Sequence, residues 1–155
     1  MNKITKNEIT AVILAGGQAS RMDGEDKGLI VFRELPLISH VINITKPKVS
    51  QILISANRNF EEYANFGKVI SDDLEGYQGP LAGISKALKV CSTPYLLVLP
   101  CDSPLIDAAL IDSLIEKMEV SNVDICVAHD GSIMHATFAL MQTKLEKSLE
   151  EFLGE

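Results

Sequence analysis

A glycine-rich, basic segment follows an apolar run near the start of the chain. After the run at 9–14 come Gly16 and Gly17, then Arg21 and Lys27. Glycines let the backbone turn sharply and approach a ligand closely, and successive backbone N–H groups in such a loop can cradle phosphate oxygens. Two glycines alone equally suit a plain surface loop, but the two cations supply the charge that a triphosphate needs and favour an anion site.

An aspartate stands at the end of a second apolar run. Asp102 comes directly after "YLLVLPC" at 95–101. Mg²⁺ prefers one or two carboxylates together with phosphate oxygens and water, so a lone aspartate at the carboxyl end of a strand suits it. Asp102 equally suits a cap for a following helix, with Pro104 near the start of that helix. The residues alone leave both interpretations open.

Short apolar runs alternate with amphipathic stretches along the whole chain, as buried strands and helices do. The predicted strands are 9–14, 51–56, 95–100 and 124–128, and the predicted helices are 36–45, one beginning at Pro80, 107–118 and 144–153. Alternating strands and helices predict a single-domain, three-layer α/β/α fold with a mostly parallel, Rossmann-like sheet. In such sheets ligands bind beyond the carboxyl ends of the strands.

The length and composition exclude several classes of protein. Residues 1–155 favour one domain with a sizeable core. The formal net charge of -7 argues against a nucleic-acid binder, and no apolar run approaches the ~20 residues of a membrane span. The three cysteines are scattered and form no C-x-x-C pair, so we expect neither a disulfide framework nor a zinc site. Because the N-terminus also lacks a signal-peptide core, we expect a cytoplasmic protein.

The loop at 14–27 resembles a known nucleotide-binding loop. It lacks the Walker pattern and the dinucleotide pattern G-x-G-x-x-G, and reads L-A-G-G-x-x-x-R-M-x-x-x-x-K. This pattern resembles that of nucleotidyltransferases with a glycosyltransferase-A-like fold, and among them the molybdenum cofactor guanylyltransferases, the MobA family. The further motifs that fit this family in order and spacing are Asn57-Arg58, Asp72 seven residues before the Gly-Pro-Leu-Ala-Gly that starts at Gly79, Pro-Cys-Asp-x-Pro at 100–104, and His129-Asp130-Gly131. The resemblance covers about 9–153.

The resemblance implies that the protein transfers GMP from GTP to the terminal phosphate of molybdopterin carrying molybdenum (the Mo cofactor) and releases pyrophosphate. It implies Mg²⁺ as the cofactor, held by Asp102, and catalytic roles for Arg21, Lys27 and Asp102. The implied nucleotide-binding positions are Leu14, Ala15, Gly16, Gly17, Lys27, Ser55, Asp72, Gly79 and Asp102. Asp72 would contact guanosine, since guanine carries donors that suit a carboxylate. The expected partners are GTP, the Mo cofactor and molybdoenzymes or their chaperones.

The chain departs from the family pattern at two places. Ser55 stands where family members often carry an asparagine, and serine is shorter but still donates and accepts hydrogen bonds. Family members also usually continue past the helix matching 144–153 with an Asn-x-Asn-Thr-Pro element, which this sequence does not contain. We therefore expect this 155-residue form to bind GTP but to transfer GMP weakly.

The remaining polar residues of the matched motifs carry weaker expectations. The resemblance makes Asn57 and Arg58 site candidates and places His129 near the second substrate. Asp130-Gly131 also suits a turn between two strands. We expect Cys101 to be a packing residue of the core.

Two alternative functions stay open. The first is another nucleotidyltransferase of the same fold, of the cytidylyltransferase or sugar-phosphate type. The cytidylyltransferases typically read L-A-A-G where this chain has Gly16, so one loop residue separates the two. The second alternative is a non-catalytic nucleotide-binding module that keeps the loop without a completed metal site.

Overall fold

The computed structural model describes residues 3–15, 21–22, 25–71 and 80–153, with the backbone alone at a few of these positions. The large sheet contains β1 (Ile9–Leu14), β6 (Gln51–Ser55), β7 (Lys68–Ile70), β8 (Tyr95–Pro100), β9 (Ile125–His129) and β10 (Met134–Gln142). Two hairpins pair β2 (Arg21–Met22) with β3 (Glu25–Asp26) and β4 (Val31–Phe32) with β5 (Leu35–Pro36). The helices are α1 (Leu37–Thr45), α2 (Phe60–Ala64), α3 (Pro80–Val90), α4 (Ala108–Val120) and α5 (Glu146–Leu153), with 3-10 turns η1 (Lys6–Glu8), η2 (Lys27–Leu29), η3 (Lys46–Lys48) and η4 (Thr143–Leu145).

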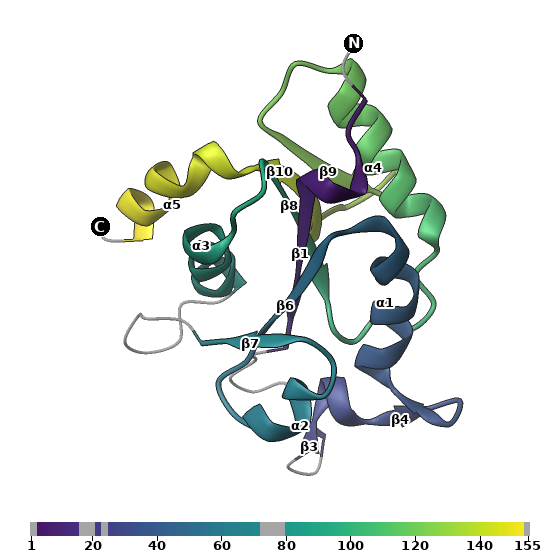
Figure 1. Cartoon of the computed structure of the whole chain (residues 1–155). Helices are drawn as coiled ribbons and strands as arrows, with labels where there is room; N and C mark the ends of the chain where they lie inside the picture. Colours follow the sequence, from purple (N-terminus) through teal and green to yellow (C-terminus); the bar gives the residue numbers. More distant parts are fainter. Residues whose placement is uncertain (1–2, 16–20, 23–24, 72–79, 154–155) are drawn as a thin grey trace.

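The large sheet is mostly parallel and has β1 near its centre (Figure 1). Its strand order is β7-β6-β1-β8-β10-β9, and β7, β6, β1 and β8 run parallel to one another. The strand β10 is antiparallel to both of its neighbours, β8 and β9. The predicted α/β fold class with a mostly parallel sheet is therefore confirmed.

Helices cover the sheet on both faces and create two hydrophobic cores. Figure 1 shows α1 and α4 on one side of the sheet and α3 and α5 on the other. Ile13 of β1 packs in the core that contains Val41 of α1 and Ile111 of α4, whereas the preceding Val12 packs in the core that contains Ala87 of α3. Successive residues of β1 thus point into opposite cores and are all apolar or buried, as parallel strands with two covered faces require.

The predicted strands and helices are confirmed, but other elements, among them β7, β10 and α2, were not predicted. The strands predicted at 9–14 and 95–100 match β1 and β8, and the helix predicted from Pro80 is α3. The elements β7 and α2 are too short to show a hydrophobic period, and the register of β10 shifts between His135 and Ala139, which breaks its alternation. The predicted turn at Asp130-Gly131 is confirmed, because Gly131 has φ +97° between β9 and β10.

The short helix α2 packs against η2, the turn that follows β3. The side chain of Tyr63, on α2, is fully buried, and this burial, together with the neighbouring Asp26 carboxylate, raises the pKa of its hydroxyl. A Cβ added to Gly28 would lie 2.7 Å from the Tyr63 hydroxyl oxygen and 3.2 Å from Cys101 Sγ. Only glycine lets η2 approach α2 and the end of β8 this closely without a shift of one of them.

We expect Gly28→Ala to lower the free energy of unfolding by about 1–3 kcal/mol, because an added methyl overpacks this contact. Thermal or urea unfolding measures the loss. The matched control is Gly28→Ala in a Tyr63→Phe background, where the nearest atom to the new methyl is removed and the loss should be smaller. An equal loss in both backgrounds would show that the Tyr63 hydroxyl does not set the limit.

Candidate active site

The carboxyl ends of three parallel strands meet at one edge of the sheet. Leu14, the last residue of β1, is in register with Ser55 of β6 and Pro100 of β8. Beyond these positions the Ala15 N–H donates to the Ser55 carbonyl at 2.8 Å, and the Cys101 N–H donates to the Leu14 carbonyl at 3.2 Å. The segments that follow the three strands therefore begin side by side, at the edge where α/β sheets bind ligands.

Lys27 and Asp102 come together at this edge. The Lys27 Nζ atom lies 3.9 Å from Asp102 Oδ2, although 75 positions separate the two residues in the chain. Their side chains are 40% and 38% exposed, so both charged groups remain open to solvent. An ion pair this long and this exposed adds little stability. Its geometry instead leaves one cation and one carboxylate accessible to a bound ligand.

The structure assigns the cap of the helix after β8 to a residue other than Asp102. The helix α4 begins at Ala108, and the Asp107 carboxylate accepts a hydrogen bond from the Ala109 N–H at 2.9 Å. Asp102 lies five residues before this cap and Pro104 lies outside the helix. The capping interpretation of Asp102 is therefore wrong, and its carboxylate is available for another role.

A buried carboxylate stands directly before Lys27. Asp26 is 5% exposed, and its Oδ2 atom accepts hydrogen bonds from Arg58 Nε at 3.3 Å and Asn59 Nδ2 at 3.2 Å. Sequence analysis placed Arg58 near the site but missed Asp26 and Asn59. The adjacency of Asp26 to Lys27 and of Asn59 to the matched Asn57-Arg58 pair was the available signal.

The family model described as a MobA-like NTP transferase domain matches residues 11–155, which is nearly the whole chain. The chain belongs to this family. Among curated proteins, the molybdenum cofactor guanylyltransferase of Shewanella sediminis (strain HAW-EB3) is 47% identical over 147 residues, covering 94% of this chain and 75% of that protein. The molybdenum cofactor guanylyltransferase of Shewanella putrefaciens (strain CN-32 / ATCC BAA-453) is 47% identical over 146 residues, with the same coverage.

Solved structures share the fold of this MobA-like chain. Molybdopterin-guanine dinucleotide biosynthesis protein A from Archaeoglobus fulgidus superposes with a TM-score of 0.72 at 21% identity, covering 93% of this chain and 72% of that one. A protein of Aquifex aeolicus VF5 (Aq1419) superposes with a TM-score of 0.76 at 24% identity, covering 97% and 78%. These similarities establish the fold independently of the sequence motifs.

Some positions that the MobA-like resemblance singles out lie outside the described residues. They are Gly16, Gly17, Asp72 and Gly79, together with the side chain of Arg21. Of the implied nucleotide-binding positions, the structure describes Leu14, Ala15, Lys27, Ser55 and Asp102. All five lie at or just beyond the carboxyl edge of β1, β6 and β8, or reach it through the Lys27–Asp102 pair.

Ser55 occupies a confined place at the end of β6. The residue is 5% exposed, and a Cβ added to Gly83 on α3 would lie 2.5 Å from Ser55 Oγ. The same added atom would lie 3.3 Å from the Leu14 side chain. Ser55, Gly83 and Leu14 therefore pack together, and the small residue on α3 lets the helix approach the strand ends.

Two other polar groups of the matched motifs have structural partners. Burial raises the pKa of the Cys101 thiol to about 12, and the neighbouring Asp102 and Asp26 carboxylates add to the shift. The expectation that Cys101 packs in the core is confirmed, and its thiol is a poor nucleophile near neutral pH. At the turn between β9 and β10, His129 Nδ1 accepts a hydrogen bond from the Gly131 N–H at 3.0 Å.

The second histidine of this hairpin pairs with the turn aspartate. His135 Nε2 lies 2.9 Å from Asp130 Oδ2, and the Asp130 Oδ1 atom accepts hydrogen bonds from the Ser132 and Ile133 N–H groups. The His135 contact and these two donors hold the pKa of Asp130 well below its usual range. These contacts stabilise the turn, and a role of His129 toward a second substrate stays a prediction.

The exposed Asp102 carboxylate is chemically suited to be one ligand of a metal ion. Among the described residues, no group of three or more His, Cys, Asp or Glu side chains could hold a metal ion. Mg²⁺ keeps several waters and usually takes one or two carboxylates together with phosphate oxygens, and the exposed Asp102 carboxylate can supply one such ligand.

Within the described part of the chain, no helix is both long and apolar enough to span a membrane.

We expect Asp107→Ala to lower the free energy of unfolding by about 0.5–2 kcal/mol, because it removes the side-chain cap of α4. The matched variant Asp102→Asn replaces an exposed carboxylate that caps no helix, so the free energy of unfolding should change by about 0.5 kcal/mol or less. Urea unfolding of both variants measures the difference. A larger loss for Asp102→Asn than for Asp107→Ala would return a structural role to Asp102.

Proposed function

We propose that this protein transfers GMP from GTP to the terminal phosphate of molybdopterin carrying molybdenum, forming the guanine dinucleotide of the Mo cofactor and releasing pyrophosphate. The observation that carries the proposal is the pairing of Lys27 with Asp102, at 3.9 Å, beyond the carboxyl ends of β1 and β8. The names of the curated relatives, molybdenum cofactor guanylyltransferases, give the chemistry that this pair would serve.

The reaction needs no nucleophile from the protein. An oxygen of the molybdopterin phosphate attacks the α-phosphorus of GTP, and the bond from that phosphorus to the α–β bridging oxygen breaks. The bonding electrons leave on pyrophosphate, so negative charge grows there in the transition state. The raised pKa of Cys101 agrees with this scheme, since the cysteine beside Asp102 stays protonated and takes no part.

The protein contributes positioning and charge. Lys27 places an ammonium group where it can contact the phosphates, and Arg21 adds a second cation from the same loop. Asp102 would hold Mg²⁺, which supplies charge neutralisation at the phosphate oxygens when bound. Leu14, Ala15, Gly16 and Gly17 would form the nucleotide loop, because backbone N–H groups of a glycine-rich loop suit phosphate oxygens.

The base and ribose would be held by the second set of positions. Asp72 would accept from the guanine donors, and Gly79 would let the backbone pass close to the nucleotide. Ser55, which packs against Gly83 and Leu14 at the end of β6, would add a hydroxyl where relatives often carry an amide. We further propose that residues 1–155 act as a single nucleotidyltransferase domain in the cytoplasm, delivering the cofactor to molybdoenzymes or their chaperones.

The proposal predicts guanine selectivity. With Mg²⁺ and molybdopterin carrying molybdenum, GTP should support pyrophosphate release, whereas CTP and ATP should be poor substrates because their bases lack the paired N1–H and amine donors. Inosine triphosphate, which lacks only the exocyclic amine, should bind more weakly than GTP. A preference for CTP would favour the cytidylyltransferase alternative. Nucleotide binding without any pyrophosphate release would favour the non-catalytic module.

A second prediction concerns the charged pair. Lys27→Ala should lower kcat/KM by roughly 30- to 1,000-fold, because losing a charge-assisted contact to the phosphates costs about 2–4 kcal/mol in the transition state. Steady-state pyrophosphate release with GTP measures the effect. The matched control is Lys48→Ala, which removes the lysine of a surface ion pair with Asp112 on α4 and should leave kcat/KM unchanged. Near-normal kcat/KM for Lys27→Ala would remove this lysine from the mechanism.

A further inference from the structure

Asp26 is a charged group in an unusual position. Its side chain is 4% exposed, and it lies at the end of β3, directly before Lys27. Burying a carboxylate costs free energy unless the group is paired and hydrogen-bonded. The groups that bond to Asp26 are therefore needed to keep it buried. The proposed reaction assigns no task to Asp26, because the carboxylate is too enclosed to serve as a ligand for a substrate that enters from solvent.

The partners of Asp26 come from a segment far along the chain. Arg58 Nε and Asn59 Nδ2 both donate to the Oδ2 atom of Asp26, at 3.3 and 3.2 Å. Asn59 has φ 54° and ψ 38°, a left-handed conformation that asparagine tolerates better than most residues. Its carbonyl also accepts a hydrogen bond from the Tyr63 N–H at 3.0 Å, so the residue that contacts Asp26 is also the N-cap residue of α2.

The residue on the other side of Lys27 is held against α2 as well. Gly28 is buried in contact distance of the Tyr63 ring and of Cys101 Sγ. Lys27 is therefore flanked by one neighbour bonded to Asn59 and another packed on Tyr63. A lysine side chain is a flexible four-carbon stem, so the position of its Cα decides which carboxylate or phosphate its ammonium can reach.

We propose that Asp26 is a positioning residue for Lys27. By accepting hydrogen bonds from Arg58 and Asn59, it joins the start of η2 to the start of α2 and so keeps the Lys27 ammonium beside Asp102. The effect of Asp26 on the reaction then passes entirely through Lys27. This inference rests on the proposed function for its kinetic readout, and on the Lys27–Asp102 pair alone for its second readout.

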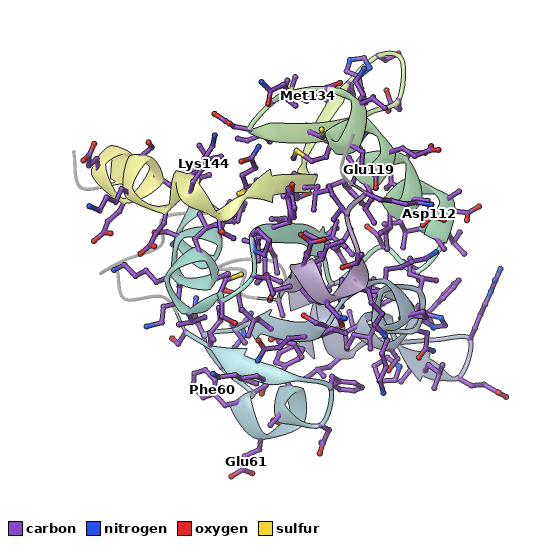
Figure 2. All side chains as sticks on the ribbon, turned by 45° about the horizontal axis from the view of Figure 1, so that its top comes forward. Phe60, Glu61, Asp112, Glu119, Met134 and Lys144 are labelled. Carbon is purple, nitrogen blue, oxygen red and sulfur yellow. The ribbon has the colours of Figure 1, made fainter. Side chains whose placement is uncertain are left out.

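The first experiment is a double-mutant cycle in pyrophosphate release. Asp26→Asn should lower kcat at least tenfold in the wild-type background and less than twofold in the Lys27→Ala background, because a displaced lysine and an absent one are equivalent. The matched control is Asp112→Asn, which removes from α4 a carboxylate that pairs with Lys48. It should leave kcat unchanged in both backgrounds. Figure 2 shows Asp112 well apart from Phe60 and Glu61 of α2. Equal losses in both backgrounds would overturn the proposal.

A second variant covers the case in which Asp26→Asn does not fold. Asn59→Gly removes the amide donor, and glycine adopts the left-handed backbone conformation without strain. Asn59→Gly should also lower kcat, by a smaller factor than Asp26→Asn, and again only when Lys27 is present. A loss of thermal stability with kcat unchanged would show that the Asn59–Asp26 bond is structural only and would overturn the positioning role.

A readout in the nucleotide-free protein separates this proposal from the proposed function. Acetylation of lysine amines by an N-hydroxysuccinimide ester, followed by mass spectrometry, gives the labelling rate of Lys27 relative to Lys48. Asn59→Gly should raise this ratio at least twofold, because an amine that is no longer held beside Asp102 is more accessible to the reagent. An unchanged ratio contradicts the positioning role. If Asn59→Gly raises the ratio but the wild-type protein shows no GMP transfer, the proposed function falls and the positioning of Lys27 stands.

Discussion

The parallel pairing of β1 with β6 and β8 is the constraint on which the rest of the structure depends. It aligns Leu14 with Ser55 and Pro100, so segments from three distant parts of the chain start at one edge. The pairing holds because β1 is buried on both faces, with Val12 in one core and Ile13 in the other. A strand that buries alternate side chains in different cores cannot slip by one residue without exchanging the two sets. The register of the site is thus fixed by packing.

Burial divides the charged residues of this edge into two kinds. Asp26 is enclosed and hydrogen-bonded to Arg58 and Asn59, whereas Lys27 and Asp102 keep more than a third of their side chains exposed. Enclosed charges define backbone positions, because moving them breaks several contacts together. Exposed charges can exchange water for a ligand at small cost. Of these two adjacent residues, Asp26 is therefore held in place by its contacts, whereas Lys27 stays open to a ligand.

The same division explains how an acidic chain can serve an anionic substrate. The formal net charge is -7, yet Lys27 lies at the carboxyl edge of the sheet, and Arg21 stands on β2, in the hairpin that precedes it. Interactions between exposed charges fade over about 8–10 Å in physiological salt, so the few cations near the edge matter more than the distant acids. The helix α3, which begins at Pro80, and α5 cover the face opposite α1 and α4 (Figure 1).

The sequence by itself determined the strands β1, β6, β8 and β9, most of the helices and the fold class, and it singled out Lys27 and Asp102 as site candidates. These rest on local patterns, since apolar runs such as 95–100 and the helical spacing in 108–120 are readable within a short window. The sequence did not determine β7 and α2, which are too short for a period, nor the role of Asp107 as the cap of α4. Only the tertiary structure decided that Asp26 is buried against Arg58 and Asn59 and that Lys27 lies beside Asp102. The physical reason is that such contacts join residues more than 30 positions apart, and their geometry follows from the packing of whole elements.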